Sequence, residues 1–452
     1  MQSLLIKNID TLVTCDDYDT VLNNVSVYCE DGVIREISSD PPAADETIDA
    51  KGMWMYPGLI NTHHHLYQYF TRNLPKVQNM ELFDWLKTLY GIWEHLNEKS
   101  IYLSSLAGMG ELMLHGCTTC LDHHYVFPKN AGSSLIDAQF SAADELGLRF
   151  HATRGSMSLS KKDGGLPPDS VVQTPDTILR DSRRLIETYH DPSPYSMRQV
   201  ALAPCSPFSV NAELLRESAH LARSYKVRLH THLCETKDEE QYTLNAFGMR
   251  PFDYMESLGW TGSDTWYAHG IHFNDSELEK LSASQTGVAH CPSSNMKLSS
   301  GVCRVPEMLR LNIPLGLAVD GSASNDGSNM LEEIRNAYLL HRLSWGERSP
   351  SAYEFLKIAT NGSAKLLGRT KLGKLALGFA ADAFLIKHER LGLVGTHFDP
   401  ASIFGTVGFA SPVDYVLVNG KITVKDGKLK NIDEQNLART CNTHIRKLLA
   451  KI

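Results

Sequence analysis

The chain has 452 residues, of which 42% are hydrophobic and 21% are charged, and its formal net charge is −8 at pH 7. That length allows a barrel of about 250 residues together with an additional domain. Because no block of lysine and arginine stands out, the sequence excludes a nucleic-acid backbone and an anionic membrane as expected partners.

The N-terminal segment M-Q-S-L-L-I-K-N-I-D contains a lysine and an aspartate where a signal peptide needs an apolar stretch. No apolar run along the chain approaches the length of a membrane span. The nine cysteines are scattered without the spacing of a disulfide scaffold. We therefore expect a cytoplasmic protein with reduced cysteines.

Short strands are predicted near both ends of the chain, with a long α/β region between them. Because chain ends usually lie close together, we expect one small β-sandwich domain made of residues 1–57 and 370–432. A C-terminal helix is predicted over residues 433–452. The strands of this composite domain are predicted near residues 3–8, 11–15, 25–30, 32–37, 54–57, 382–387, 415–421 and 421–427.

The middle of the chain, residues 58–369, alternates apolar runs with helical patterns, which is typical of a parallel sheet covered by helices. Eight such units predict a (β/α)8 TIM barrel rather than an open sheet. The barrel strands are predicted near residues 58–63, 118–122, 148–153, 199–204, 227–232, 265–269, 286–290 and 315–320.

Polar residues end most of these predicted strands, and barrel enzymes place their chemistry at the carboxyl ends of the strands. A single histidine there could be a hydrogen-bonded core residue, but several from different strands would meet at one mouth of the barrel. The sequence therefore predicts a functional site there. The residues are His63, His65, Asp122, Arg154, Cys205, His230, His232, His269, His290 and Asp320.

The run H-H-H near the first barrel strand suggests a metal site. Successive side chains of a strand point to opposite faces, so His63 and His65 share one face while His64 points away. His230 and His232 repeat this alternation, and Asp320 adds a carboxylate. Histidines combined with an aspartate suit Zn²⁺ or Fe²⁺.

These motifs resemble the amidohydrolase superfamily. The resemblance rests on N-T-H-H-H after the first barrel strand, H-L-C-E after the fifth, A-H-G after the sixth and V-D-G-S after the eighth. It covers essentially the whole chain, because I-D-A-K-G-M-W-M-Y-P-G-L-I-N and G-K-L-A-L-G-F-A-A-D-A are typical of the segments that lead into and out of the barrel. Within the superfamily, H-H-H-L-Y-Q, T-R-G-S-M-S-L and L-A-P-C-S-P-F-S-V are similar to motifs of the 8-oxoguanine deaminases.

The resemblance implies a role for each residue of the site. Glu235 would be the proton shuttle, and His269 would polarise the attacked centre. His230 would be a packing or second-layer residue. Because Q-V-A-L-A-P-C on the fourth strand has no lysine to bridge two metals, one divalent ion is expected, zinc first and iron as the alternative. The implied ligands are His63, His65, His232 and Asp320.

The implied reaction is deamination of an oxopurine nucleobase, with 8-oxoguanine giving urate and ammonia, by a chain that forms homo-oligomers. Alternatives are isocytosine or another aminated ring as substrate, hydrolysis of a chloro- or alkylamino-triazine, and a ring-binding protein without activity. Arg154 could instead form a structural ion pair, Tyr67 and Gln68 could be loop packing, and Trp93 is expected in the core. The candidate substrate contacts are Tyr67, Gln68, Arg154 and Cys205.

One further run, H-G-C-T-T-C-L-D-H-H, contains a C-x-x-C pair, Cys117 and Cys120, followed by His123 and His124. It could be read as a zinc knuckle or a redox pair, but no second pair of ligands follows at a suitable spacing. Because the run lies where the second barrel strand is predicted, we expect structural burial.

Overall fold

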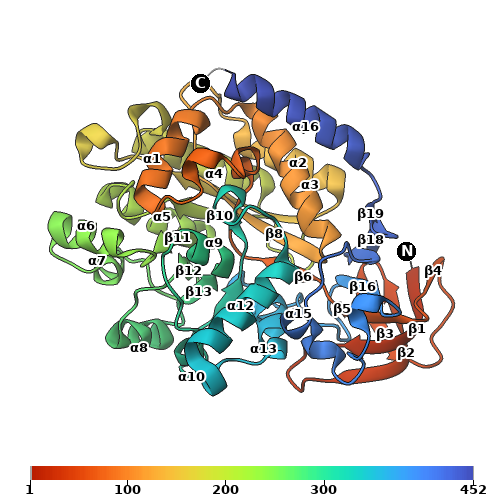
Figure 1. The fold of residues 1–452 in the computed structure, drawn as a ribbon. Helices are drawn as coiled ribbons and strands as arrows, with labels where there is room; N and C mark the ends of the chain where they lie inside the picture. Colours follow the sequence, from red (N-terminus) through yellow and green to blue (C-terminus); the bar gives the residue numbers. More distant parts are fainter. Residues whose placement is uncertain (1–2, 451–452) are drawn as a thin grey trace.

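The computed structural model describes residues 3–450, and it combines a barrel with a sheet to which both ends of the chain contribute (Figure 1). Residues 1–2 and 451–452 lie outside the described residues, and with them the last two positions of the predicted C-terminal helix. Within the described part of the chain, no helix is long and apolar enough to cross a membrane.

An eight-stranded parallel sheet forms the barrel, and its two edge strands lie side by side. The edges meet where the Thr62 amide donates to the Leu317 carbonyl at 3.3 Å, and where β7 (His64–His65) pairs with β15 (Asp320–Gly321). The predicted (β/α)8 barrel is thus confirmed. Its strands, in order, are β6 (Leu59–Asn61), β8 (Cys117–His124), β9 (Arg149–Ser156), β10 (Arg198–Pro204), β11 (Leu229–Leu233), β12 (Thr265–His269), β13 (Gly287–His290) and β14 (Leu315–Leu317).

A layer of apolar side chains fills the barrel interior. Ile60, Leu121 and Trp266 meet there in one buried cluster, together with small residues such as Ala201 and Ala289. The alanines leave room for the indole of Trp266, which is fully buried. Since protein interiors are close-packed, this layer separates the two ends of the barrel.

Helices follow the strands and cover the outside of the barrel (Figure 1). In α4, for example, Ile178, Leu185 and Ile186 form the buried stripe, and the Thr174 side chain caps the first turn by accepting from the Thr177 amide. The helices along the barrel are α1 (Leu82–Trp93), α2 (Glu98–Leu114), α3 (Leu135–Leu146), α4 (Pro175–Tyr189), α5 (Ala212–Tyr225), α6 (Lys237–Phe247), α7 (Pro251–Ser257), α8 (Asp275–Ser284), α9 (Pro292–Lys297), α10 (Val305–Arg310), α11 (Ser322–Asn325), α12 (Met330–Trp345), α13 (Ala352–Lys357) and α14 (Ser363–Leu366).

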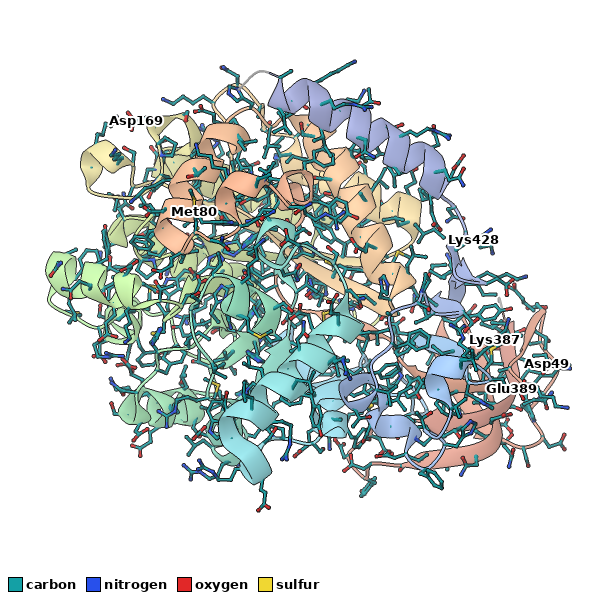
Figure 2. The ribbon with its side chains drawn as sticks, in the orientation of Figure 1. Asp49, Met80, Asp169, Lys387, Glu389 and Lys428 are labelled. Carbon is teal, nitrogen blue, oxygen red and sulfur yellow. The ribbon has the colours of Figure 1, made fainter. Side chains whose placement is uncertain are left out.

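The two ends of the chain form a nine-stranded sheet in which β5 pairs antiparallel with β16, as the sequence predicted for a domain shared by both termini. In the expected terminal β domain, eight strands follow one hydrogen-bonded path and β4 pairs with β1 off that path, and the predicted domain boundaries stay predictions. Charged side chains such as Asp49 and Lys387 lie on its surface (Figure 2). Its strands are β1 (Ser3–Val13), β2 (Val21–Glu30), β3 (Val33–Ser38), β4 (Glu46–Asp49), β5 (Met53–Pro57), β16 (Ala383–Lys387), β17 (Tyr415–Val418), β18 (Lys421–Lys425) and β19 (Lys428–Leu429).

Two details of this sheet differ from the prediction. The strands predicted at 3–8 and 11–15 are one strand, β1, because its pairing register shifts between Ile6 and Ile9 around Asn8, whose φ is +60°. The sequence also did not indicate the two short strands β4 and β19, which contain exposed residues. Short edge strands with polar residues lack the apolar alternation by which strands are recognised.

The C-terminal helix α16 (Glu434–Leu449) lies against α2, as Figure 1 shows. Asp433 caps its first turn by accepting from the Asn436 amide at 3.0 Å. The buried Cys441 packs with Phe70 and Leu103. The helix thereby covers the segment that follows the histidine run, and the predicted C-terminal helix is confirmed over the described residues.

Candidate active site

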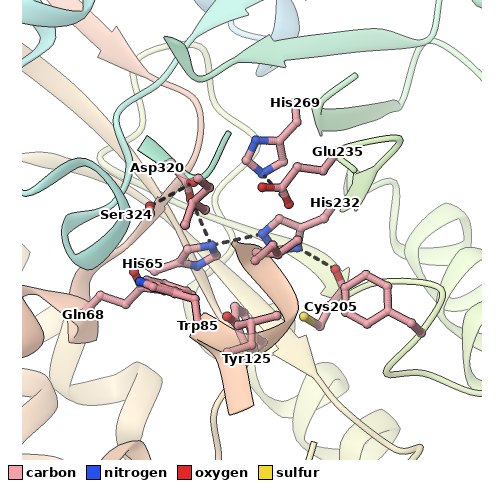
Figure 3. A pocket seen from close by; sticks show the side chains of 14 residues that line it. His65, Gln68, Trp85, Tyr125, Cys205, His232, Glu235, His269, Asp320 and Ser324 are labelled. Carbon is pink, nitrogen blue, oxygen red and sulfur yellow. Dashed lines mark hydrogen bonds and ion pairs between the residues drawn. The ribbon is translucent and has the colours of Figure 1, made fainter. Parts of the chain in front are cut away.

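The carboxyl ends of the barrel strands bring together side chains from β7, β11 and β15 (Figure 3). The Nε2 atoms of His65 and His232 are 3.1 Å apart. Asp320 Oδ1 lies 3.2 Å from His63 Nε2 and 3.3 Å from His65 Nε2. These four residues are buried, and the structure therefore brings all four predicted metal ligands to one point.

Backbone carbonyls fix the orientation of two of these imidazoles. His65 Nδ1 lies 2.7 Å from the His123 carbonyl oxygen, and His232 Nδ1 lies 2.7 Å from the Cys205 carbonyl oxygen. Because a carbonyl oxygen can only accept, each Nδ1 must carry the proton and donate. In the neutral form of each ring, Nε2 then presents a lone pair to the centre of the site.

His230 fixes the third imidazole in the same way. Its Nδ1 donates to the Trp266 carbonyl at 3.0 Å, so that its Nε2 must accept. His63 Nδ1 lies 2.7 Å from that Nε2 and donates to it, which leaves a lone pair on His63 Nε2. Burial lowers the pKa of His230 to about 3 and that of His63 well below its usual value, so both rings are neutral. His230 is a second-layer residue, as expected.

This donor set fits a metal ion. In their neutral forms the three imidazoles direct lone pairs at one another and at a carboxylate oxygen, and such a cluster of acceptors is repulsive without a cation. His63 Nε2 has no hydrogen-bond partner among the described residues. Nitrogen and carboxylate ligands in a buried site are the set that Zn²⁺ takes. Two overlapping groups have ligand atoms within 4.8 Å of one another: His63, His65, His123 and His232, and His63, His232, His269 and Asp320.

The sequence analysis missed the proximity of His123. Cys117 and Cys120 are free and buried, as predicted, but the ring of His123 stacks on His232 with centroids 4.7 Å apart. Its Nε2 donates to the Ala203 carbonyl at 2.7 Å, and its Nδ1 has no partner among the described residues. Strand alternation would have placed His123 toward the interior of the barrel, but it could not show which histidine it meets.

The second oxygen of Asp320 is held by hydroxyl groups. Ser294 Oγ donates to Oδ2 at 2.5 Å, and Ser324 Oγ donates to it at 3.1 Å. The backbone of Asp320 is left-handed, with a φ of +62°, and His269 has a φ of +72°. Left-handed residues other than glycine cost free energy and concentrate at functional sites, so the fold holds both side chains against a local preference.

Glu235 and His269 face each other beside this cluster (Figure 3). Glu235 Oε2 lies 3.5 Å from His269 Nε2, whose Nδ1 donates to Asn295 Oδ1 at 2.9 Å. Burial raises the pKa of Glu235, which favours its protonated form. For His269, burial alone would lower the pKa, but the charges of Glu235 and Asp320 outweigh it and raise the pKa.

A buried carboxyl group supports Glu235 from behind. Glu239 Oε2 accepts from the Glu235 backbone amide at 2.9 Å, and burial raises the pKa of Glu239 to about 7. Ser300 Oγ donates to Glu235 Oε1 at 3.3 Å. The carboxyl group of Glu235 is thus positioned at the cavity with one oxygen toward His269.

A cavity of about 360 Å³ opens onto the cluster, and two of the four predicted substrate contacts line it. They are Gln68 and Cys205. The aromatic and apolar side chains of the wall suit a flat ring. The lining residues are His65, Gln68, Leu82, Trp85, Leu86, Tyr125, Cys205, Phe208, His232, Glu235, His269, Leu298, Asp320 and Ser324.

Arg154 and Tyr67 do not line this cavity. Arg154 Nε donates to Asp181 at 2.6 Å and its Nη2 donates to Gln173 at 2.7 Å, which is the structural ion pair that was the alternative reading. The ring of Tyr67 packs edge-on against Trp93, with centroids 5.1 Å apart. Trp93 is fully buried and donates to Thr71 Oγ1, so it belongs to the core as expected.

Sequence reasoning missed Trp85, which lines the cavity from α1. Leu82, Trp85 and Leu86 have the spacing of a buried helix stripe, and that pattern does not distinguish a core residue from a cavity wall. Two buried polar atoms at this wall, Trp85 Nε1 and Gln68 Oε1, have no hydrogen-bond partner among the described residues. One is a donor and the other an acceptor, which a polar ring could satisfy.

Known proteins share this sequence and fold. The amidohydrolase family matches residues 54–423 of the chain. An 8-oxoguanine deaminase from Pseudomonas aeruginosa is 48% identical over 408 residues, which are 89% of this chain and 90% of the relative. A hydroxydechloroatrazine ethylaminohydrolase from Pseudomonas sp. is 40% identical over 465 residues, which are 99% of this chain and 96% of the relative.

Solved structures agree with these relatives. The crystal structure of an atrazine chlorohydrolase from Arthrobacter aurescens, complexed with zinc, superposes with a TM-score of 0.94 at 33% identity. The match covers 98% of this chain and 100% of that chain, so it includes both the barrel and the terminal sheet.

Proposed function

The chain belongs to the amidohydrolase family, and we propose that it is a metal-dependent hydrolytic deaminase that converts 8-oxoguanine and water to urate and ammonia. The observation that carries the reaction class is the position of Glu235 and His269 at the cavity, beside Asp320 and the imidazole lone pairs. The 48% identity over 89% of the chain to an 8-oxoguanine deaminase supports the choice of substrate.

In this proposal His63, His65, His232 and Asp320 hold one divalent ion, with zinc as the first choice and iron as the alternative. Once bound, the ion would lower the pKa of water from 15.7 to about 7, which supplies a nucleophile at neutral pH. A zinc complex of a similar fold supports the choice of metal. The β10 segment R-Q-V-A-L-A-P contains no lysine that could bridge a second ion.

Asp320 and Glu235 move the protons. Asp320 Oδ1, which faces the cluster, takes the proton of the attacking water. Glu235, whose pKa is raised by burial, donates a proton from Oε2 to the ring nitrogen next to the attacked carbon. The proton on Asp320 then goes to the exocyclic amine, the C–N bond breaks with loss of ammonia, and the hydroxyl proton of the tetrahedral carbon returns to Glu235, so that an amidine carbon becomes a lactam carbonyl and both carboxyl groups regain their starting state. Positioned acid–base groups contribute typically about 10²–10⁴-fold.

His269 orients and polarises the attacked centre. Its Nδ1 donates to Asn295, and Glu235 lies at its Nε2, so the ring is held in one orientation. We assign the ring contacts to Gln68, Cys205 and Trp85, because these line the cavity. A buried polar atom left without a partner is penalised, and this penalty discriminates against rings with the wrong edge.

Two alternatives follow from the relatives and from the reacting edge. Isocytosine presents the same N–C(NH₂)–N edge as 8-oxoguanine without the five-membered ring. An alkylamino-triazine is the second alternative, because a relative named an ethylaminohydrolase is 40% identical over 99% of this chain. That reaction would release an alkylamine instead of ammonia.

The test is a substrate panel assayed with the metal-loaded enzyme. We expect ammonia release with the largest kcat/KM for 8-oxoguanine, because contacts to the five-membered ring provide binding energy that can raise the rate. A wide margin in favour of isocytosine would reject the purine assignment but keep the reaction class. Alkylamine release at a higher kcat/KM than any ammonia release would replace deamination by triazine hydrolysis.

Exposed apolar side chains support the expectation of a homo-oligomer. Leu391 and Phe398 are each 95% exposed and Val394 is 76% exposed, all within one connection between β16 and β17. Soluble proteins seldom leave such side chains together in solvent unless another surface covers them. Light scattering coupled to size-exclusion chromatography should give a molar mass of more than one chain per particle. A double variant, Leu391→Asp with Phe398→Asp, should lower that molar mass toward the monomer.

We also propose that the protein keeps its thiols reduced, as expected for the cytoplasm. All nine cysteines are buried and free, and burial raises the pKa of thiols such as Cys117 and Cys205 to about 12. A thiol with a raised pKa is unreactive toward disulfides. Native thiol titration with a small reagent should therefore be slow before denaturation and give nine thiols after it.

A further inference from the structure

A second cavity lies at the opposite end of the barrel, where the strands begin. It is a partly open hollow of about 600 Å³, a volume that includes the solvent space at its mouth. Positively charged and neutral side chains line it, and its wall contains no aspartate or glutamate. The lining residues are His151, His190, Pro192, Gln199, Val200, Ala201, Lys226, Val227, Arg228, Trp266, Leu367 and Gly368.

Arg228 is the partly buried cation of this wall, whereas Lys226 is exposed. Arg228 Nη2 donates to the Ser263 carbonyl at 2.6 Å, its Nε is buried without a partner, and it forms no ion pair among residues 3–450. Burial lowers the pKa of Arg228 to about 10, which still leaves it protonated at neutral pH. The guanidinium therefore has an unused donor, and Asp264 acts on its pKa through space without forming an ion pair with it.

Arg369 adds a second cation without an ion pair directly behind the wall. It is 3% exposed, and it donates to the Ser196 carbonyl at 2.8 Å and to His151 Nε2 at 2.8 Å. None of its partners among the described residues carries a negative charge. Burial lowers the pKa of Arg369 to about 9.

Two fully buried arginines elsewhere in the barrel have the ion pairs that Arg228 and Arg369 lack. Arg149 is paired with Asp382, and Arg154 is paired with Asp181. Buried charges are normally paired, because desolvating an isolated charge costs several kcal/mol or more. The two unpaired arginines thus lie beside a cavity that is large enough to hold the counter-ion.

Further donors line the same cavity. His190 Nδ1 accepts from the Val200 amide at 3.2 Å, so the proton of the neutral ring is on Nε2, which can donate. Lys226 follows α5 in a left-handed conformation, with φ +57°, and its exposed side chain lies at the cavity. A guanidinium, an imidazole and an ammonium from different segments suit a tetrahedral oxyanion, which has more acceptor oxygens than a carboxylate.

We propose that this cavity binds a phosphate group, as inorganic phosphate or as the end of a small phosphorylated metabolite, with Arg228 as its main partner. The site is separated from the deaminase centre by the apolar layer that contains Trp266. It is independent of the proposed reaction, because no residue of its wall lines the other cavity.

Calorimetric titration of the metal-loaded enzyme with inorganic phosphate, at constant ionic strength, tests the proposal. We expect one saturable site per chain in the wild type and at least about tenfold weaker binding in Arg228→Met, since a charge-assisted hydrogen bond is lost. The matched control is Arg216→Met on α5, because Arg216 is exposed, lies outside the cavity wall and should leave binding unchanged. Ammonia release should be unaffected in both variants.

Lys226→Met is a second variant that tests the site even if Arg228→Met fails to fold, because Lys226 is exposed. It should weaken phosphate binding several-fold. Ribose 5-phosphate in place of inorganic phosphate distinguishes the two sources, because tighter binding of the sugar phosphate assigns the cavity to a metabolite. The proposal is overturned if the wild type binds neither probe at about 10 mM, or if both Arg228→Met and Lys226→Met bind as tightly as the wild type.

Discussion

The two ends of the barrel present opposite unsatisfied groups. At the carboxyl ends of the strands, imidazole nitrogens and Asp320 face each other as lone pairs, and His63 Nε2 has no donor. At the amino ends, guanidinium N–H groups face a cavity, and Arg228 Nε has no acceptor. Buried polar atoms are rarely left without a partner, so one end calls for a cation and the other for an anion.

The difference arises from the residues that end and begin the strands. Neutral histidines with Nδ1 held by carbonyls can only accept at Nε2, whereas arginines can only donate. A packed layer around Trp266 lies between the two groups, and its ring stacks on His230 with centroids 4.4 Å apart. The two ends should therefore respond separately to metal and to phosphate.

The largest expected effect comes from the cation end. His63→Ala should lose the metal and essentially all turnover together, whereas phosphate binding at the amino end should persist. Elemental analysis of the purified variants gives the metal content, with about one equivalent expected in the wild type. Two equivalents in fully active enzyme would contradict the single-ion site.

His64→Ala is the matched control, because His64 points away from the cluster and bonds to Ser328 at 2.9 Å. It should keep the metal, although loss of a buried side chain can lower its stability. Metal loss from His64→Ala to the same extent as from His63→Ala would mean that the histidine run acts as one structural unit.

Glu235→Gln should retain the metal and lose about 10²–10⁴-fold in kcat, because the amide keeps the shape and removes the transferable proton. The raised pKa of Glu235 sets the sign of the pH dependence. The wild-type rate should fall as pH rises through that pKa, since the acid loses its proton, and the variant should lack this decline. A kcat within about tenfold of wild type would refute the shuttle role.

His230 tests whether fixing a tautomer matters. His230→Leu removes the acceptor of the His63 Nδ1 proton and should weaken metal affinity by about 10–100-fold, the range typical of second-layer partners. His230→Gln, which can accept at the same place, should recover part of the affinity. Competition with a chelator measures the metal affinity without relying on activity. If both variants bind the metal as tightly as the wild type does, His230 has only a packing role.

Much of this arrangement could be predicted from the sequence, because strand alternation and chain order determine where a side chain points. His63, His65 and His232 are at strand ends, so their convergence followed from the barrel. Trp85 and His123 could not be placed, since a buried helix stripe and a buried strand residue have the same pattern whether they face core or cavity. The partner of Arg154 was equally invisible, because Asp181 lies 27 residues away on a helix.

Arg154 gives the smallest expected catalytic effect and the sharpest comparison with Arg228. Arg154 is fully buried and paired with Asp181 at 2.6 Å, whereas Arg228 is partly buried and not paired. Breaking a buried pair leaves the other charge uncompensated and costs about 3 kcal/mol, so Arg154→Met should be markedly less stable in urea than Arg228→Met. Because Arg154 does not line the active-site cavity, KM for 8-oxoguanine should rise by less than about threefold, a small loss of binding free energy. A larger rise in KM at unchanged metal content would support the prediction that Arg154 contacts the substrate. Equal destabilisation of the two variants would mean that Arg228 already has a counter-ion in the purified protein, which dialysis against chloride before the measurement would reveal.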